Sequence, residues 1–326
     1  MYRILPTLLL LSSCGVFGLS AEEAELLASY QRNAKTYWGG GDFDRALSQV
    51  RRGLELSPDD YQLHVIKASC LLRMSNNNAR TLDSAIDAFD HVLTLRADQD
   101  QGPQARLGYA QAYTKRGIRA MREHNTIQQD AERLGLKGAE LELQNSRAEK
   151  LALDAAADLR RAKSQLELMV NAGDYVLEAY FTLMQVSAWQ GDYAQAIQFG
   201  DAYLTRVGEL QDSIRKNLES TVIVEYEREI RIRLQNRLDE ELEVRGFLAN
   251  LHYKQGHHEL VVEQLTAILK KNPRLHREYF NRARSLLQLG RLAEAKSDYE
   301  RFLYSTNLPR ENPQVKAALA ALKEIE

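Results

Sequence analysis

The sequence of 326 residues is poor in cysteine and carries no excess charge of either sign. Two cysteines cannot hold together a disulfide-stapled scaffold. The 43 Lys and Arg residues balance 45 Asp and Glu residues, which argues against a nucleic-acid binder held by bulk positive charge. A charged fraction of 27% and a mean hydropathy of -0.44 exclude a polytopic membrane protein.

Proline is also scarce, with six residues in the whole chain and none between residues 104 and 272. Proline interrupts helices, so a long stretch without it is compatible with continuous helix. The same stretch is rich in Ala, Leu, Glu, Gln and Arg, which favour helices. The composition therefore predicts an all-α fold and argues against β and α/β classes.

The N-terminus resembles an export signal. Arg3 supplies a small positive region, and residues 4–11 form an apolar run that is too short to span a bilayer, which takes about 20 residues. These features are typical of a signal peptide over residues 1–13. The alternative is an apolar terminus that simply buries Cys14.

The end of this signal has two interpretations. The sequence Leu11-Ser12-Ser13-Cys14 resembles the bacterial lipobox and predicts that Cys14 is acylated, with residues 14–26 as a tether. Ordinary cleavage near Gly18-Leu19-Ser20 is the other possibility. Lipidation of Cys14 would anchor the rest of the chain to a membrane surface.

Internal repeats organise the remainder of the chain. Gly41, Gly191 and Gly290 are each followed five residues later by an alanine, and Gly256 and Gly290 lie 34 residues apart. The intervals from Gly41 to Pro58 and from Gly256 to Pro273 are both 17 residues. A fixed period of this length indicates a repeat protein.

The pattern resembles that of tetratricopeptide (TPR) repeats. The resemblance implies a right-handed α-solenoid of about six helix pairs, in which glycine ends the first helix of a pair and alanine lets the second helix pack closely. It further implies a protein that binds protein partners and catalyses no reaction. The expected division of the chain is a signal peptide at 1–13, a tether at 14–26, repeats one to three beginning at 27–117, an inserted hairpin at 118–161, the end of repeat three and repeat four at 162–208, a long connecting helix at 209–241, repeats five and six at 242–309 and a capping helix at 310–326.

Two of these segments depart from the family pattern. Residues 118–161 interrupt the third repeat and predict a long helical hairpin. Residues 209–241 carry an apolar residue at every fourth position, which predicts one long amphipathic helix. Its apolar stripe would pack against the hairpin or a neighbouring repeat, or would serve as a docking or oligomer surface.

Motifs for bond chemistry are missing. The sequence has no P-loop, no dinucleotide fingerprint and no nucleophile elbow. His252, His257 and His258 cluster at a turn and could bind a metal, but a polar turn is the simpler interpretation. Cys70 falls at a packing position and is expected to be buried and inert. We therefore expect no enzyme activity, no cofactor and no metal.

The resemblance implies a concave groove lined by the first helix of each repeat. Aromatic residues would anchor a partner there, and amides or basic side chains would bind its backbone and carboxylates. The set is less dense in Lys, Asn and Arg than a clamp for a C-terminal carboxylate. The expected groove residues are Gln31, Lys35, Trp38, Gln62, Val65, Ser69, Leu107, Gln111, Phe181, Gln185, Asn250, Arg277, Phe280 and Arg284.

The sequence thus predicts an exported scaffold that is anchored through Cys14, faces the periplasm from a bacterial outer membrane, and binds protein partners of the envelope. It predicts no nucleic-acid binding. The alternative is a periplasmic ligand-binding or transporter-associated subunit. The partner, the oligomeric state and the choice between groove and hairpin as the main binding surface stay open.

Overall fold

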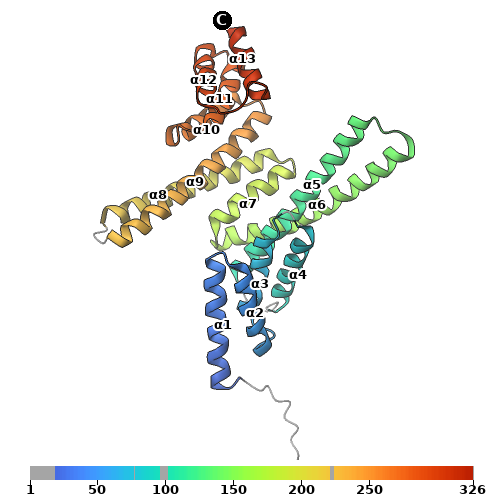
Figure 1. The fold of residues 1–326 in the computed structure, drawn as a ribbon, viewed down its shortest axis with the longest axis vertical. Helices are drawn as coiled ribbons and strands as arrows, with labels where there is room; N and C mark the ends of the chain where they lie inside the picture. Colours follow the sequence, from blue (N-terminus) through green and yellow to red (C-terminus); the bar gives the residue numbers. More distant parts are fainter. Residues whose placement is uncertain (1–18, 77, 96–101, 221–223, 326) are drawn as a thin grey trace, which may run out of the picture. The chain divides into compact units, whose positions relative to one another are not determined.

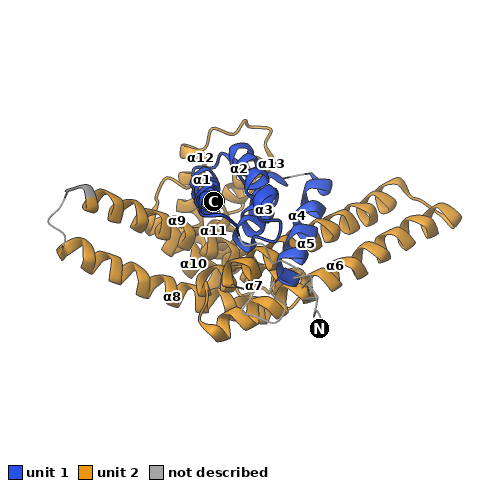
Figure 2. Ribbon diagram, turned by 90° about the horizontal axis from the view of Figure 1, so that it is seen from below, with its two compact units in different colours: residues 1–101 blue, residues 102–326 orange. Residues whose placement is uncertain are grey.

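A computed structural model describes residues 19–76, 78–95, 102–220 and 224–325. These residues form thirteen α-helices and no β-strand, which confirms the predicted all-α class (Figure 1). The chain divides into two compact units, residues 1–101 and 102–326 (Figure 2). None of the described helices is both long and apolar enough to cross a bilayer. Cys14 and the signal predicted over 1–13 lie outside the described residues.

Unit 1 contains two antiparallel helix pairs. Helix α1 (Ala21–Gly39) packs on α2 (Phe43–Leu56), and α3 (Tyr61–Met74) packs on α4 (Ala79–Leu95). Each pair buries an apolar face that neither helix could cover alone, as expected for stacked repeats.

The first helix begins earlier than the sequence suggested. Ser20 caps α1 by accepting a hydrogen bond from the Glu23 amide, and the Glu23 carboxylate accepts one from the Ser20 amide. This capping box satisfies two backbone groups at the helix start and stabilises it. Residues 21–26 are therefore helical, and assigning them to a tether was wrong.

Cys70 lies in the core of unit 1. Its side chain is fully buried on α3 and carries a free thiol. Burial raises the pKa of the thiol to about 12, so Cys70 is protonated and unreactive at neutral pH. The prediction that Cys70 is buried is confirmed, and its raised pKa is consistent with an inert thiol.

Unit 2 continues the pattern of paired helices. Consecutive helices are antiparallel neighbours, and the last one packs on the pair before it. The helices are α5 (Pro103–Leu134), α6 (Gly138–Ala172), α7 (Val176–Trp189), α8 (Tyr193–Ser220), α9 (Val224–Lys254), α10 (His258–Lys271), α11 (His276–Gln288), α12 (Leu292–Ser305) and α13 (Pro313–Ile325).

The repeat residues occupy the positions that their chemistry requires. The turn glycines adopt positive φ angles, for example 78° at Gly41 and 71° at Gly290, a region that side chains with a Cβ avoid. The alanines five residues after these glycines, Ala46 and Ala295, are fully buried in the second helix of their pairs. A small side chain there lets the two helices approach closely.

Helices α5 and α6 form a long hairpin. A Cβ added at Gly117 would lie 2.9 Å from Leu159 Cγ and 3.2 Å from the Ala155 carbonyl oxygen, so only glycine permits this approach. Arg116 also joins the helices, donating from Nε and Nη2 to the two carboxylate oxygens of the buried Asp158 at 2.7 and 2.9 Å. Such bidentate pairs fix the register of the two helices.

A second hairpin replaces the single helix predicted over 209–241. Helix α8 ends at Ser220, α9 begins at Val224, and the two pack against each other. Gln211 on α8 reaches α9, donating from Nε2 to the Glu241 carboxylate at 2.8 Å. The predicted apolar stripe is therefore shared between two helices. Thr221-Val222-Ile223-Val224 are four consecutive β-branched residues, which weaken helix propensity at the point where the prediction failed.

The two hairpins extend from opposite edges of unit 2 (Figure 2). The α5–α6 hairpin lengthens the turn inside one repeat, whereas the α8–α9 hairpin lengthens the turn between two repeats. In a stack of helix pairs these two kinds of turn lie at opposite ends of the helices, which accounts for the opposite directions.

Candidate functional site

A polar pocket of about 470 Å³ opens in unit 2 between α9 and α11. Its floor is apolar and is formed by Ala249, Val261 and Leu265. Polar side chains surround this floor, and Gln314 contributes from α13. We call this the basic pocket; its remaining lining residues are Gly246, Asn250, Tyr253, Arg277, Glu278, Asn281 and Arg284.

Helical spacing places the polar residues on facing surfaces of two helices. Arg277, Asn281 and Arg284 follow each other at intervals of four and three residues, so they share one face of α11. Asn250 and Tyr253 share one face of α9 in the same way. The two faces are open to solvent because Asn250, Arg277 and Arg284 are all exposed.

The basic pocket carries two arginines without a carboxylate partner. Arg284 donates from Nη2 to the Tyr253 hydroxyl, and its guanidinium lies 4.8 Å from the centre of the Tyr253 ring. Glu278 accepts a hydrogen bond from Asn281 Nδ2 at 3.2 Å. Neither Arg277 nor Arg284 forms an ion pair within the described part of the chain. Their positive charge is therefore available to a ligand.

A second pocket of about 190 Å³ lies where α7, α8 and α9 meet. Its floor is formed by Leu177, Phe181 and Tyr203, and three glutamates and Arg237 surround it. Glu240 is already satisfied, because it accepts from the Tyr203 hydroxyl at 3.0 Å and from Arg237 Nη1 at 2.6 Å. We call this the acidic pocket.

The other two glutamates of the acidic pocket are unpaired. Glu178 on α7 is half-buried and Glu243 on α9 is exposed, and among the residues that the structure describes neither forms an ion pair. Burial, followed by the nearby Glu240 carboxylate, raises the pKa of the Tyr203 hydroxyl, so that ring stays neutral. The acidic pocket therefore offers negative charge above an aromatic floor.

Helix α9 joins the two pockets. Glu243 lines the acidic pocket, and Gly246, one turn later, lines the basic pocket. Apart from its chain neighbours and the backbone of α9 itself, no atom lies within 4 Å of a Cβ built at Gly246, so the surface of α9 is open between the pockets. We call the combined surface the docking face; it comprises Glu178, Phe181, Glu240, Glu243, Gly246, Asn250, Arg277 and Arg284.

Four of the predicted groove residues lie on this docking face. Asn250, Arg277 and Arg284 line the basic pocket, and Phe181 lines the acidic pocket. Gln111 and Gln185 are half-buried, and neither lines either pocket.

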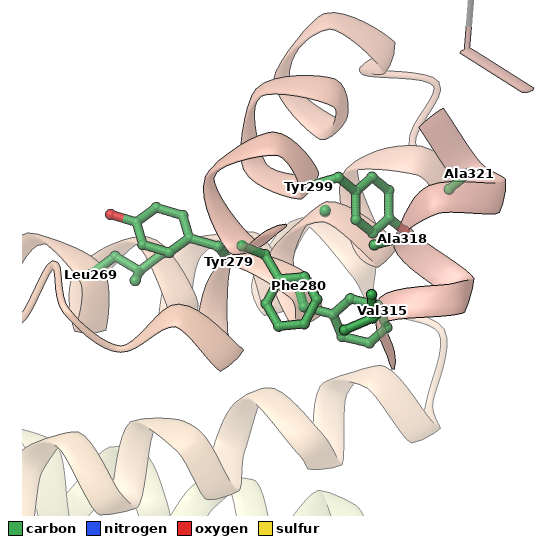
Figure 3. Packing of buried hydrophobic residues seen from close by; sticks show 9 residues of the cluster. Leu269, Tyr279, Phe280, Tyr299, Val315, Ala318 and Ala321 are labelled. Atoms are coloured by element: carbon green, nitrogen blue, oxygen red, sulfur yellow. The ribbon is translucent and has the colours of Figure 1, made fainter. Parts of the chain in front are cut away.

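Two predicted groove residues of unit 2 instead belong to the core. Leu107 is only 9% exposed and Phe280 only 5%. The Phe280 ring packs 5.1 Å from the Phe302 ring and lies among the side chains that fix α13 to the preceding pair (Figure 3). Assigning Phe280 as an exposed anchor was wrong, because the position that the repeat pattern gave to the groove faces the second helix of its own pair.

The predicted groove residues of unit 1 also divide between surface and core. Lys35 and Gln62 are exposed, while Trp38 and Ser69 are half-buried. Val65 is 5% exposed and belongs to the core.

Gln31, also of unit 1, has a structural contact. Its Nε2 donates at 2.7 Å to Asp60, the residue that caps α3. Gln31 therefore helps to hold α1 against the start of α3.

Sequence reasoning missed several lining residues. Tyr253 and Asn281 could have been predicted from the sequence, because they lie three or four residues from predicted groove residues on the same helices. Glu240 was hidden by the assumption that 209–241 was a connecting helix, and Glu243, in the predicted fifth repeat, was not among the expected groove positions. Gln314 could not be predicted, because only the fold brings α13 to the rim.

The histidine cluster gives no sign of a metal site. No group of three potential metal-binding side chains occurs in the described part of the chain. His252 is 5% exposed, and burial lowers the pKa of its imidazole, which favours the neutral ring. The Nδ1 atom of His258 lies 3.4 Å from the hydroxyl oxygen of Ser285.

A stack of antiparallel helix pairs with an open polar face is an α-solenoid. The family model for the tetratricopeptide repeat matches residues 32–99 and 248–314, which cover repeats one and two and repeats five and six. These two segments of the chain are therefore tetratricopeptide repeats. No curated protein sequence matches it.

Two solved structures align with most of this chain. The structure of PilF from Pseudomonas aeruginosa aligns with a TM-score of 0.51 and 14% identity, covering 92% of this chain and 99% of that one. A thermophilic TPR protein of Thermus thermophilus aligns with a TM-score of 0.40 and 15% identity, covering 80% and 99%. At 14% identity, the similarity to PilF concerns the fold alone. TPR proteins are in general non-catalytic and bind other proteins.

Proposed function

We propose that this protein is an exported, lipid-anchored scaffold that binds protein partners of a bacterial envelope through the docking face of unit 2. The observation that carries the proposal is that Asn250, Arg277 and Arg284, from two successive repeats, line one pocket. Exposed arginines and amides around an apolar floor suit recognition of a polypeptide segment. The two hairpins would then position or stabilise the assembly.

Reversing the charge of the basic pocket tests the docking function. Arg277→Glu combined with Arg284→Glu should remove most of the partner protein crosslinked in intact cells, because both arginines are exposed and their loss leaves the core intact. The matched control is Lys270→Glu with Arg310→Glu, which makes the same charge change at exposed positions elsewhere in unit 2. Equal recovery from both double variants would contradict the proposal.

The membrane anchor is proposed from the sequence Leu11-Ser12-Ser13-Cys14. Cys14→Ala should move the protein from the membrane fraction to the soluble fraction and abolish incorporation of labelled palmitate. The proposal fails if the variant stays with the membrane and the unaltered protein takes up no label.

One observation favours the alternative of a small-ligand subunit. The volume of the basic pocket falls within the range of about 300–1,000 Å³ that is usual for small-molecule sites. A bound metabolite would raise the melting temperature of the purified protein by mass action. A rise with small carboxylates that Arg277→Glu abolishes would favour this alternative over a scaffold.

A further inference from the structure

We propose that the docking face binds an extended protein segment that carries one basic and one acidic side chain, about four or five residues apart. This inference rests on the proposed docking function and adds the chemistry of the partner. It follows from the charges of the two pockets, from their separation along α9 and from the open backbone between them.

The two pockets present opposite charges that the protein leaves unpaired. Glu178 and Glu243 stand over the aromatic floor of the acidic pocket, and Arg277 and Arg284 stand at the basic pocket. A lysine or arginine of the partner would complement the first pair, and an aspartate or glutamate would complement the second. Attraction in such partly enclosed sites is stronger than in open water, because the local dielectric is lower.

The separation of the pockets sets the spacing in the partner. On α9, the residues that line the acidic pocket are centred on Glu240 and those that line the basic pocket are centred near Asn250. These centres lie ten residues apart, which corresponds to about 15 Å along the helix axis. An extended peptide covers this distance with about four or five residues. A segment in the opposite orientation would need the same spacing with the order of the two charges reversed.

Gly246 lets the segment pass between the pockets. It lacks a side chain at the point where α9 separates them, and the space above it is open. A partner backbone can therefore approach the helix closely there. Glycine in the middle of a helix is less favourable than alanine, so its position on the open face of α9 is consistent with a requirement other than stability.

A bead library of random nonapeptides tests the inference with the purified full-length protein. The peptides have acetylated N-termini and are attached through their C-termini, so only side chains carry charge. The unaltered protein should enrich sequences that pair Lys or Arg with Asp or Glu at a spacing of four or five, at least tenfold over the unselected library. Gly246→Tyr should remove the enrichment altogether. Arg277→Glu with Arg284→Glu should remove only the preference for the acidic residue and leave the preference for the basic residue.

The outcomes separate this inference from the docking function. Enrichment that Gly246→Tyr abolishes, but without a paired acidic and basic residue, would overturn the inference and leave the docking function standing. A protein that enriches no sequence, or that enriches the same sequences when Gly246 is tyrosine, would contradict both.

Discussion

Gly246→Tyr is expected to reduce crosslinked partner protein at least tenfold while the protein remains folded. A Cβ at this position meets no atom of another helix within 4 Å, so the side chain can point into open space without disturbing the core. The ring instead occupies the space through which the partner would pass. Melting temperature should stay unchanged or rise, because almost any residue favours a helix more than glycine does.

Gly246→Ala is the matched control for this experiment. It gives α9 the same gain in helix propensity but adds only a methyl group, so partner recovery should stay near that of the unaltered protein. Circular dichroism and thermal melting establish that both variants fold. Equal recovery with alanine and tyrosine at position 246 would show that the partner does not cross this surface.

Glu241→Gln should have the largest effect on stability, because Glu241 is the centre of a buried polar network at the base of the α8–α9 hairpin. Its side chain is 6% exposed and forms ion pairs with Lys271 and, at 2.8 Å, with Arg245. Gln211 donates a further hydrogen bond from α8 at 2.8 Å. Removing the charge leaves two basic groups without their partner, which should cost about 3 kcal/mol of unfolding free energy.

Urea unfolding measures this cost, with Asp239→Asn as the control. Asp239 is exposed on the same helix, so its neutralisation should change the unfolding free energy by less than about 0.5 kcal/mol. A similar midpoint for Glu241→Gln and Asp239→Asn would mean that the buried network does not hold the hairpin.

The effect of Glu241 should depend on pH. Burial alone would raise the pKa of its carboxyl, but the hydrogen bonds from Lys271 and its other donors lower it to about 2. A carboxyl with a lowered pKa stabilises the folded state fully above its unfolded pKa of about 4.3. The stability difference between the unaltered protein and Glu241→Gln should therefore be largest near neutral pH and shrink as the pH falls from about 5 towards 2.

Much of the fold followed from a few local rules. Glycine and alanine at a fixed interval predicted the turns and the close helix contacts, because a positive φ angle and a small side chain are properties of single residues. Asn250, Arg277 and Arg284 were predicted for the same reason, since a regular repeat gives each helix position a fixed direction.

Other features depended on tertiary packing. The apolar stripe over 209–241 has the same period whether it lies on one helix or is divided between two, so periodicity could not reveal the α8–α9 hairpin. The place of Phe280 in the repeat predicts that it faces the groove, but its ring packs in the core beside Phe302. The acidic pocket forms only because the hairpin brings Glu240 and Glu243 beside α7.

Site-specific photo-crosslinking in intact cells tests the central claim most directly. A photoreactive phenylalanine analogue would replace Gln314, at the rim of the basic pocket, or Leu143, a 69% exposed residue of the α5–α6 hairpin. The docking face predicts that the partner is captured from position 314, and that Gly246→Tyr in the same chain abolishes this capture. Capture from position 143 alone would place the binding surface on the hairpin and contradict the account.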